Sequence, residues 1–435
     1  MHLITALAAL VFVVLVAAQG KGTGYGPEKV KQEVGYITVN GTRGDEGVHM
    51  WYWFFESRSN PSTDPLLLWM TGGPGCSSLV ALFYENGPYH IDKNLSLSLN
   101  PNSWNEVANV IWIDQPVGTG FSYADHTDDM ITNEKEMAED MYEFLQKFLT
   151  QNPKYRPSDF YIFGESYAGH YVPALSARVV DGNNAGGNPK INLVGSAIGN
   201  GWVDPLEQYG AYADFLHSKK LLDVVSQGVY NNVLYPTCEG LIDSGVWPAA
   251  FLECSLGMTA ALSDAEAQNG RTINVYDVRI PCEVEPLCYD FSLADKLLAS
   301  ADVKKALGVD PSRGWVDCAT EVHTLLIGDW VQSFRDDVPK LLQNGVRVLV
   351  YSGMEDFVCN YMGGERWLNS MKWSGQDQFL DEEMQPWIVN ATDAGFKKSV
   401  KGLTWLTVAN AGHMVPMNQP ENALEMVKQF FSGKL

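Results

Sequence analysis

Short apolar runs recur along the 435-residue chain, and most of them end in glycine or other turn-forming residues. Continuous runs of about four to eight apolar residues are typical of strands buried on both faces of a largely parallel sheet. We therefore predict strands at residues 65–70, 109–113, 160–163, 191–198, 346–351 and 403–408. Helical patterns separate several of them, at residues 134–149, 167–180 and 421–431. Strands and helices in alternation indicate an α/β fold.

The stretch from about residue 205 to 320 breaks this alternation. It has no clear buried strand, and it holds five of the seven cysteines. The segments on both sides of it contribute predicted strands to one sheet. We therefore interpret it as a cap inserted over the carboxyl edge of that sheet and stapled by disulfides. An independent second domain is the alternative.

The N-terminus begins with an uncharged apolar run at residues 3–18 that ends in small residues. The run is shorter than the ~20 residues that a membrane span usually needs. We therefore predict a secretory signal peptide at residues 1–18 and a mature domain at residues 19–435. No later stretch is long and apolar enough to span a bilayer, so stable membrane insertion is not expected.

Secretion would place the cysteines in an oxidising compartment. Their number, seven, is odd, so at least one thiol is unpaired or reaches outside the chain. No Cys-x2-Cys pair is present, which argues against a zinc site. Sequons for N-glycosylation fit passage through the secretory pathway, and they stand at Asn40, Asn94 and Asn390.

The composition is strongly acidic, with 30 Lys and Arg against 52 Asp and Glu and a formal net charge of −22. Nucleic acids and anionic membranes are bound by basic patches, so this charge argues against both as partners. Hydrophobic residues make up 46% of the chain and aromatic residues 11%, which excludes a disordered protein.

The strongest chemical signal is the sequence Phe-Gly-Glu-Ser-Tyr-Ala-Gly-His at residues 163–170, where a predicted strand passes through a tight turn into a predicted helix. Small residues two before and two after Ser166 let strand and helix approach closely, which forces the serine hydroxyl out above the sheet. Ala168 replaces the last glycine of the strict G-x-S-x-G pattern and is still small. A serine at a helix start can be a simple N-cap. The coincidence of strand, turn and helix nevertheless favours a nucleophile elbow with Ser166 as the nucleophile.

A serine nucleophile needs a base and a carboxylate that orients the base. In elbow enzymes these follow the serine in the order acid, then histidine, each after a later strand. Of the eight histidines, only His413 lies late in the chain and follows a strong apolar run. Glu355 and Asp356 both stand just past the predicted strand at 346–351, and the pattern alone does not separate them.

A glycine-rich loop at residues 69–78, Trp-Met-Thr-Gly-Gly-Pro-Gly-Cys-Ser-Ser, directly follows another predicted strand. Consecutive glycines expose backbone N–H groups, so this loop could supply an oxyanion donor that complements the N–H of Tyr167. The loop lacks both a following Gly-Lys-Ser/Thr and the dinucleotide glycine spacing. A nucleotide-binding role is therefore disfavoured.

Together these motifs resemble the serine carboxypeptidases of peptidase family S10, and the chain is similar to their carboxypeptidase Y and cathepsin A branch. The matching stretches are residues 69–78, 83–88, 114–123, 164–171, 198–201, 274–279, 356–360 and 410–416. The resemblance implies an α/β-hydrolase fold with a mostly parallel central sheet and a disulfide-stapled cap. It also implies that no cofactor or metal is needed.

The resemblance further implies roles for individual residues. Ser166, His413 and Asp356, rather than Glu355, would form the catalytic triad. The oxyanion hole would be made by the N–H groups of Gly73 and Tyr167. Substrate binding would involve Trp69, Thr71, Gly72, Glu85, Glu165, Cys359 and Met414. The implied disulfides are Cys76–Cys318, Cys282–Cys288 and, with the remaining pair, Cys238–Cys254, which leaves Cys359 as the free thiol.

Two glutamates beside a nucleophile would suit a substrate with a free C-terminal carboxylate. If Glu85 and Glu165 share a proton, they can donate to a carboxylate that they would otherwise repel. Binding would then weaken as the pH rises through the titration of the pair. Thr71 stands where the family usually has asparagine, and acyltransferase relatives in plants also carry threonine there.

We therefore expect a serine carboxypeptidase of the secretory pathway that releases C-terminal residues from peptides and proteins at acidic pH through an acyl-enzyme. It would reside in the lysosome, the vacuole or the extracellular space, with a homodimer as one candidate assembly. Two alternatives stay open. One is acyl transfer to an acceptor other than water, and the other is a protective binding partner of other hydrolases.

Overall fold

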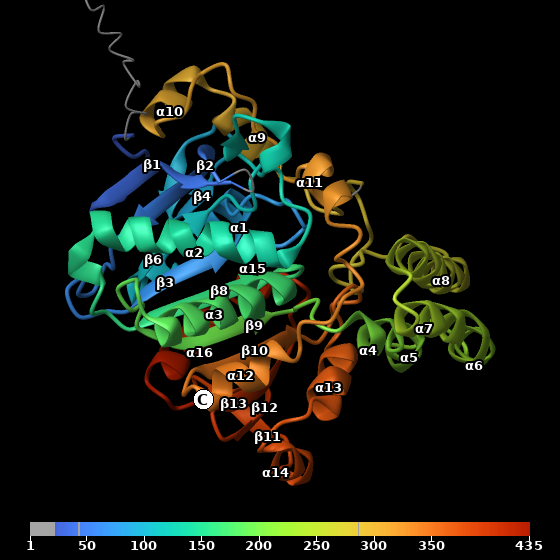
Figure 1. Ribbon diagram of the computed structural model, residues 1–435. Helices are drawn as coiled ribbons and strands as arrows, with labels where there is room; N and C mark the ends of the chain where they lie inside the picture. The colour runs from blue at the N-terminus through green and yellow to red at the C-terminus, as the bar shows by residue number, and fades with distance from the viewer. Residues whose placement is uncertain (1–21, 42–43, 286) are drawn as a thin grey trace, which may run out of the picture.

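The computed structural model describes residues 22–41, 44–285 and 287–435, so the predicted signal peptide at residues 1–18 lies outside the described residues. A sheet of eleven strands runs through the centre of the molecule (Figure 1). Its strands are β1 (Gln32–Asn40), β2 (Glu46–Phe55), β3 (Leu66–Met70), β6 (Asn109–Ile113), β7 (Tyr123–Ala124), β8 (Phe160–Glu165), β9 (Leu193–Gly199), β10 (Arg347–Gly353), β11 (Gln385–Val389), β12 (Thr392–Val400) and β13 (Leu403–Val408). A separate hairpin consists of β4 (Tyr89–Ile91) and β5 (Leu97–Leu99).

The strand order is β1-β2-β6-β3-β8-β9-β10-β13-β12-β11, and β7 pairs with β2. The six strands β6, β3, β8, β9, β10 and β13 run parallel to one another. They coincide with the six strands predicted from the apolar runs, so the predicted parallel interior is confirmed. The antiparallel strands at the two ends of the sheet, β1, β2, β12 and β11, were not predicted.

Helices cover both faces of the sheet (Figure 1). On one face lie α2 (Glu134–Gln151), α3 (Ala168–Ala185), α12 (Asp337–Gln343) and α13 (Tyr361–Ser370). On the other face lie α1 (Leu79–Tyr84), α9 (Ser292–Leu298), α10 (Ala301–Ala306), α15 (Val415–Asn418) and α16 (Pro420–Phe431). The remaining α-helices are α4 (Pro205–Tyr209), α5 (Tyr212–Ser218), α6 (Val224–Val229), α7 (Tyr235–Asp243), α8 (Trp247–Asn269), α11 (Thr320–Leu325) and α14 (Gln376–Asp381). Among the described residues, no helix is both long and apolar enough to cross a bilayer.

The central strands need apolar residues at every position because they contribute to two cores. In β8, Ile162 belongs to the core under α2 and α3, whereas Tyr161 and Phe163 belong to the core under α16. Phe430 of α16 packs against both of these aromatic rings. Successive strand residues point to opposite faces, so a strand covered on both sides is read in the sequence as a continuous apolar run.

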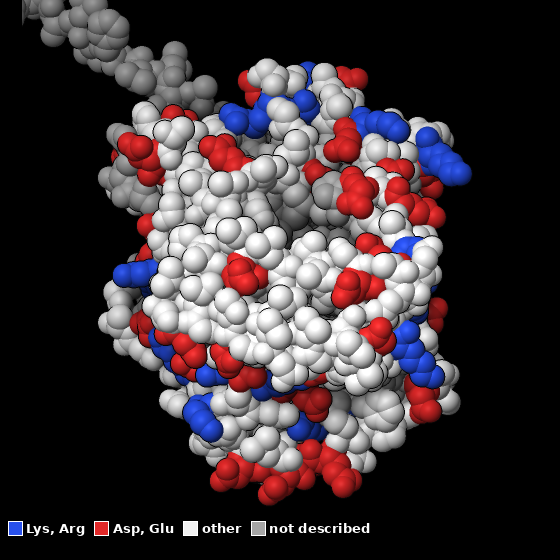
Figure 2. Space-filling model, turned by 90° about the vertical axis from the view of Figure 1, so that its right-hand side faces the viewer, with Lys and Arg blue, Asp and Glu red and all other residues white. Residues whose placement is uncertain are grey.

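Between β9 and β10 the described chain forms helices and turns, and no strand. In the first part of this segment, α6 and α7 run back against α8, and the disulfide Cys238–Cys254 joins α7 to α8. This helical hairpin projects beside the carboxyl ends of the central strands (Figure 1). No lysine or arginine occurs between Lys220 and Arg271, and Figure 2, seen from this side, shows a broad central area with few charged residues.

The later part of the predicted cap lies elsewhere. Helices α9 and α10 pack into the core that contains Trp51 and Trp53 of β2. The indole N–H of Trp51 donates to the carbonyl oxygen of Leu307 at 3.2 Å. Residues 292–307 therefore do not belong to the helical hairpin. They cover the sheet near β1 and β2. The extent of the cap, about 205–320, stays a prediction.

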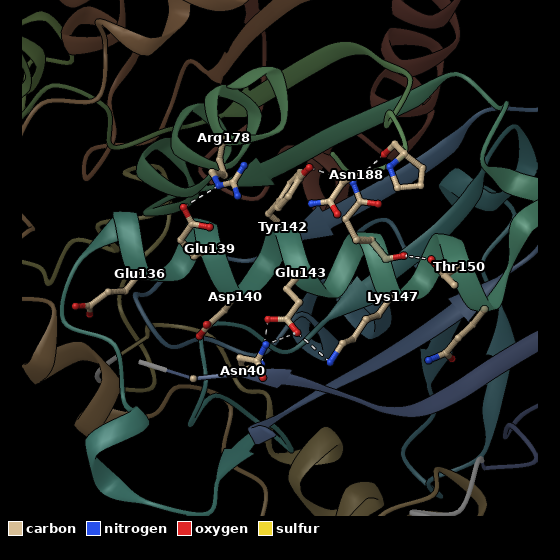
Figure 3. A pocket seen from close by; sticks show the side chains of 14 residues that line it. Asn40, Glu136, Glu139, Asp140, Tyr142, Glu143, Lys147, Thr150, Arg178 and Asn188 are labelled. Atoms are coloured by element: carbon tan, nitrogen blue, oxygen red, sulfur yellow. Dashed lines mark hydrogen bonds and ion pairs between the residues drawn. The ribbon is translucent and has the colours of Figure 1, made fainter. Parts of the chain in front are cut away.

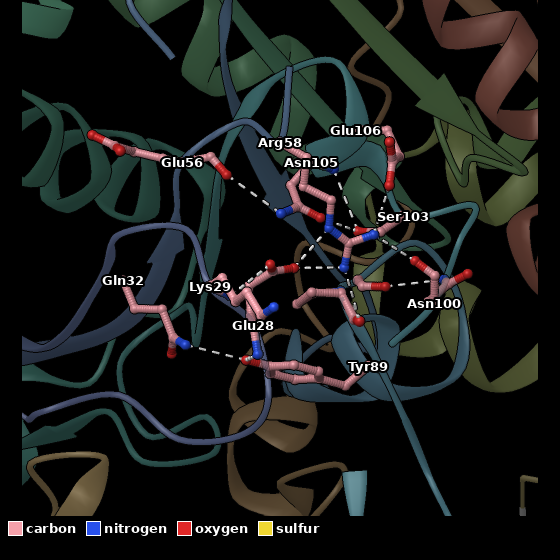
Figure 4. A network of polar contacts seen from close by, with 12 residues as sticks. Glu28, Lys29, Gln32, Glu56, Arg58, Tyr89, Asn100, Ser103, Asn105 and Glu106 are labelled. Carbon is pink, nitrogen blue, oxygen red and sulfur yellow. Dashed lines mark hydrogen bonds and ion pairs between the residues drawn. The ribbon is translucent and has the colours of Figure 1, made fainter. Parts of the chain in front are cut away.

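A polar network around Arg58 fixes the segment that follows α1 (Figure 4). Its guanidinium donates to the carboxylates of Glu28 at 2.7 Å and Glu106 at 2.8 Å, and to the carbonyl oxygen of Asn100 at 2.7 Å. The amide of Asn100 in turn donates to the carbonyl oxygen of Glu85 at 3.3 Å. Because the Arg58 side chain is only 15% exposed, these charge-assisted bonds hold the backbone at Glu85 firmly.

Candidate active site

The turn between β8 and α3 has the geometry of a nucleophile elbow. Ser166 at its apex has a φ of 67°, a left-handed conformation that a serine adopts only under constraint. A Cβ on Gly164 would lie 2.6 Å from the Cβ of Ala168, and one on Gly169 would lie 2.5 Å from the carbonyl oxygen of Trp202. Strand, helix and the segment after β9 thus approach too closely for larger side chains, and Ala168 fits where the strict pattern has glycine.

The structure brings the predicted triad residues together from three loops. Nδ1 of His413 lies 2.8 Å from Oδ2 of Asp356, and both side chains are buried. The His413 loop is held by its backbone N–H, which donates to the carbonyl oxygen of Tyr276 at 2.7 Å. Ser166 and His413 line the same cavity. Asp356 can therefore orient the imidazole so that its second nitrogen, Nε2, can accept the hydroxyl proton of Ser166.

The acid position, which the sequence pattern left open between two carboxylates, is occupied by Asp356. Glu355 turns away and pairs with Lys219, with 2.9 Å between the charged atoms. Sequence reasoning missed a further residue at this position. Asn200 donates from Nδ2 to Oδ2 of Asp356 at 2.8 Å, and its Oδ1 accepts the N–H of Gly353 at 3.1 Å. Its position in an Ile-Gly-Asn-Gly motif directly after a predicted strand was the available signal.

The glycine-rich loop lies against the elbow, where an oxyanion hole has to be. A Cβ on Gly72 would lie 2.4 Å from the backbone nitrogen of Tyr167, so only glycine allows this approach. Within the described residues, the N–H groups of Gly73 and Tyr167 donate to no other backbone group. Both are therefore free to donate to an oxyanion that forms above Ser166.

A buried polar cluster supports this loop from below. The hydroxyl of Ser77 donates to Asp114 at 2.5 Å, and the indole N–H of Trp315 donates to the same hydroxyl at 3.1 Å. Burial raises the pKa of Asp114 to about 7, although the hydrogen bonds it accepts act in the opposite direction. The disulfide Cys76–Cys318 ties the loop covalently to the segment before α11. The loop is therefore a rigid part of the site.

A cavity of about 450 Å³ opens in front of the nucleophile. Its lining includes Ser166, His413, Glu85, Glu165 and Met414. Both glutamates are almost fully buried, at 3% and 2% exposure. Burial raises the pKa of Glu85 to about 7, and burial together with the neighbouring Glu85 carboxyl raises the pKa of Glu165 well above its usual range. The pair therefore holds protons at acidic and near-neutral pH.

Thr71 also lines this cavity, whereas Trp69 lies behind it. The indole N–H of Trp69 donates to the hydroxyl oxygen of Thr71 at 3.0 Å. Thr71 keeps its own hydroxyl proton available for a ligand in the cavity, because a hydroxyl donates and accepts at the same time. Trp69 is thus in contact with the cavity through the hydroxyl of Thr71.

A second, smaller cavity of about 220 Å³ begins at Ser166 and extends toward the helical hairpin. Its lining includes Cys359 and, from α8, Phe251 and Met258. Cys359 is the free cysteine of the described residues and is buried. Burial raises the pKa of its thiol well above the usual range, and the Asp356 carboxylate adds to this effect.

A larger cavity lies elsewhere, along the outer side of α2 (Figure 3). It measures about 810 Å³ and is lined by several acidic side chains, among them Glu139, which pairs with Arg178, and Glu143, which pairs with Lys147. The described residues that line it include no nucleophile paired with a base. We therefore place the candidate active site at Ser166 and not in this larger cavity.

The other predicted site residues lie as follows. The disulfides are Cys76–Cys318, Cys238–Cys254 and Cys282–Cys288, which are the pairs that the resemblance implied. The three sequon asparagines are all exposed, and they are Asn40, Asn94 and Asn390. In the part of the chain that the structure describes, two clusters of buried side chains have metal-ligand spacing: Asp356 with Cys359 and His413, and Glu134 with His170 and Asp329. We assign a metal to neither, because the first includes the triad and both oxygens of Asp329 already accept hydrogen bonds.

Comparisons with known proteins agree with this geometry. The serine carboxypeptidase family profile matches residues 23–433. A serine carboxypeptidase-like protein of Oryza sativa subsp. japonica is 42% identical over 427 residues, which cover 96% of each chain. A serine carboxypeptidase S10 family member of Dictyostelium discoideum is 42% identical over 401 residues, covering 92% of this chain and 94% of its own.

Among solved structures, a prohormone-processing carboxypeptidase from Saccharomyces cerevisiae superposes with a TM-score of 0.83 at 26% identity. The superposition covers 95% of this chain and 94% of the yeast chain. The predicted α/β-hydrolase fold, with its mostly parallel sheet and disulfide-stapled cap, is thereby confirmed. The chain belongs to the serine carboxypeptidase family.

Proposed function

We propose that this protein is a serine-type carboxypeptidase that releases C-terminal amino acids from peptides and proteins at acidic pH. The observation that carries this proposal is the pair of buried glutamates in the cavity of the nucleophile. Hydrolysis of an ester needs no such pair. A substrate with a free carboxylate next to the reacting carbonyl does need groups that can donate to that carboxylate.

The positions of the residues support the following reaction. Ser166 attacks the last peptide carbonyl while His413 accepts the hydroxyl proton. The oxyanion that forms accepts hydrogen bonds from the N–H groups of Gly73 and Tyr167. His413 then gives the proton to the leaving amino acid, and an acyl-enzyme remains on Ser166. Water, activated by the same histidine, attacks the acyl-enzyme and releases the shortened peptide. Asp356 orients the imidazole throughout.

The glutamate pair gives the reaction its pH dependence. Below the raised pKa, about 7 for Glu85, the pair carries protons and can donate to the substrate carboxylate. As the pH rises through the titration of the pair, the pair loses its protons, and its growing negative charge repels the substrate carboxylate. KM for peptides should therefore rise as the pH increases through the titration of the pair, whereas KM for substrates with an amidated C-terminus should not show this rise.

Acyl transfer is the second candidate, because Thr71 stands where an asparagine would offer two donors. The contact with Trp69 directs the threonine but leaves it one donor. Glu85 and Glu165 remain, and this favours the peptidase. Product analysis with a peptide and with an acyl-glucose ester separates the two reactions, and exclusive turnover of the ester would reject the peptidase. The third candidate is that this protein binds other hydrolases and protects them. Failure of an active-site phosphonate to label Ser166 in folded protein would support this role.

We also propose passage through the secretory pathway, with residence in the lysosome, the vacuole or the extracellular space. Three disulfides and three exposed sequons support this route. Peptide and protein C-termini are the proposed partners, and a homodimer is a proposed assembly that light scattering would test.

The deciding experiment compares the wild type with Ser166→Ala on a blocked dipeptide with a free C-terminus. The variant should lose at least about a thousandfold in kcat/KM, because removal of a triad member leaves only the residual effect of the oxyanion hole and binding. Ser196→Ala is the matched control, since Ser196 is a buried serine on β9 that contacts only Ser176 by its hydroxyl. Release of the C-terminal amino acid by Ser166→Ala at the wild-type rate would reject the proposal.

A further inference from the structure

Three adjacent parallel strands bring a tyrosine next to the glutamate pair. Glu165 at the end of β8 is in register with Gly199 of β9, and Gly199 is in register with Tyr351 of β10. Side chains in register on neighbouring strands point to the same face of the sheet. Glu165 and Tyr351 therefore lie on one face, separated only by a residue without a side chain.

The absent side chain at Gly199 is what lets the tyrosine reach across. A Cβ at this position would lie 2.2 Å from Cζ and 2.3 Å from the hydroxyl oxygen of Tyr351. The ring thus occupies the space above Gly199, and its hydroxyl lies over β9, the strand between β10 and β8. Gly199 has an ordinary backbone conformation, so the need for glycine here comes from the tyrosine ring.

The tyrosine hydroxyl is buried and has no hydrogen-bond partner among the described residues. The Glu85 and Glu165 carboxyls can share a hydrogen bond with each other, and no other described group donates to the two oxygens of Glu85 or to Oε2 of Glu165. Buried polar atoms are rarely left without a partner. Burial raises the pKa of Tyr351 far above its usual range, and the charges of Glu165 and then Glu85 add to this effect, as expected for neighbouring groups.

We propose that Tyr351 is a positioning residue whose hydroxyl donates to the Glu85–Glu165 carboxyl pair and so sets the pH range in which the pair receives a substrate carboxylate. This inference rests on the proposed carboxypeptidase function. A donor stabilises the charged form of the carboxyl group that accepts from it. Tyr351 therefore keeps the pair from holding its protons too tightly, directly or through one bridging water.

Other titratable groups also act on the pair, and they must stay constant in a test. The Asp356 carboxylate raises the pKa of Glu165, and His413 lowers the pKa of Glu85. Tyr289 and Cys359 lie near enough to feel the charge of Glu165. All four remain in place when only the hydroxyl of Tyr351 is removed.

The test is the variant Tyr351→Phe, with KM and kcat measured from pH 4 to 9 on a blocked dipeptide with a free C-terminus. We expect the pH at which KM begins to rise to move upward by about half a unit or more. Above that pH, KM should be about threefold lower than in the wild type, because half a unit corresponds to a factor of about three. kcat should stay within about twofold, since no triad atom is changed.

Tyr52→Phe is the matched control, because the Tyr52 hydroxyl also donates to a buried glutamate, Glu33, at 2.8 Å, but far from the cavity. It should leave the KM profile unchanged. Gly199→Ala offers a second route, since its Cβ displaces the ring but keeps the hydroxyl, and it should move the profile in the same direction as Tyr351→Phe. An unchanged profile in Tyr351→Phe would overturn the inference. If the wild type itself does not hydrolyse the dipeptide, the proposed function fails first.

Discussion

Asn200 offers a sharp test of how the triad acid is held. We consider Asn200→Gly, which removes the side chain and is compatible with the left-handed backbone at this position, where φ is 41°. Two hydrogen bonds disappear. One is the donation to the Asp356 carboxylate, and the other is the acceptance of the N–H of Gly353.

The loss of stability can be estimated because Asp356 and Gly353, the two partners of Asn200, are both buried. A hydrogen bond to a charged group contributes about 1.5–3 kcal/mol, and a buried N–H left without an acceptor costs about 1–3 kcal/mol. The variant should therefore lose roughly 3–5 kcal/mol in the free energy of unfolding. If the bond to Asp356 is also needed in the transition state, its loss lowers kcat/KM by about ten- to a hundredfold, at 1.36 kcal/mol for each factor of ten.

Urea unfolding and kcat/KM at acidic pH measure the two effects. Asn410→Gly is the control, because Asn410 is also left-handed, with a φ of 56°, but its side chain is exposed. That variant reports the effect of the added glycine alone. Our reasoning would be refuted if Asn200→Gly unfolded within about 1 kcal/mol of Asn410→Gly and kept kcat/KM within about threefold of it.

Three further predictions concern stability and access. Burial raises the pKa of Asp114 to about 7 and of Asp140 to about 8, so between pH 4 and pH 8 the folded state holds protons that the unfolded state has released. The urea midpoint should therefore be highest near pH 4 and fall as the pH rises to 8, and a rising midpoint would contradict this. Gly164→Ala should lower the melting temperature by several degrees, because the new Cβ would lie 2.7 Å from the carbonyl oxygen of Met70, which cannot move aside. An unchanged melting temperature would show that the elbow tolerates the methyl group. N-ethylmaleimide should react slowly with Cys359, because this thiol is buried and protonated, and the reaction should inactivate the enzyme because Cys359 lies beside the nucleophile. Cys359→Ser should resist inactivation by N-ethylmaleimide, and equal inactivation of this variant would show that another group reacts.

The interior of the fold could be predicted because burial on both faces leaves a clear pattern. Each of the six parallel strands is read as a continuous apolar run, and the elbow adds a turn at a fixed place. Strand β2 is equally buried, and the run at residues 50–55 offered the same signal. Strands β11 and β12 are half exposed. Strand β12 contains charged residues, and the apolar run in β11 is only the three residues 387–389, so no long apolar run marks either strand.

The site was less accessible to pattern reasoning because it joins residues far apart in the sequence. The choice between Glu355 and Asp356 depends on which carboxylate faces His413, and nothing local to two adjacent acids decides this. Asn200 and Tyr351 act through contacts across strands whose order is not written in the sequence. The resemblance to a family supplied Glu85, whose burial beside Glu165 arises only when α1 is folded against the sheet.

The disulfide Cys76–Cys318 has a consequence for the time at which the protein becomes active. It joins two cysteines separated by 242 residues, and one of them lies in the loop that offers the oxyanion donor. The tether can therefore form only after three quarters of the chain have been synthesised and have met an oxidant. A chain that has not yet formed this bond keeps the loop untied, so we expect the site to be complete only after the disulfide has formed.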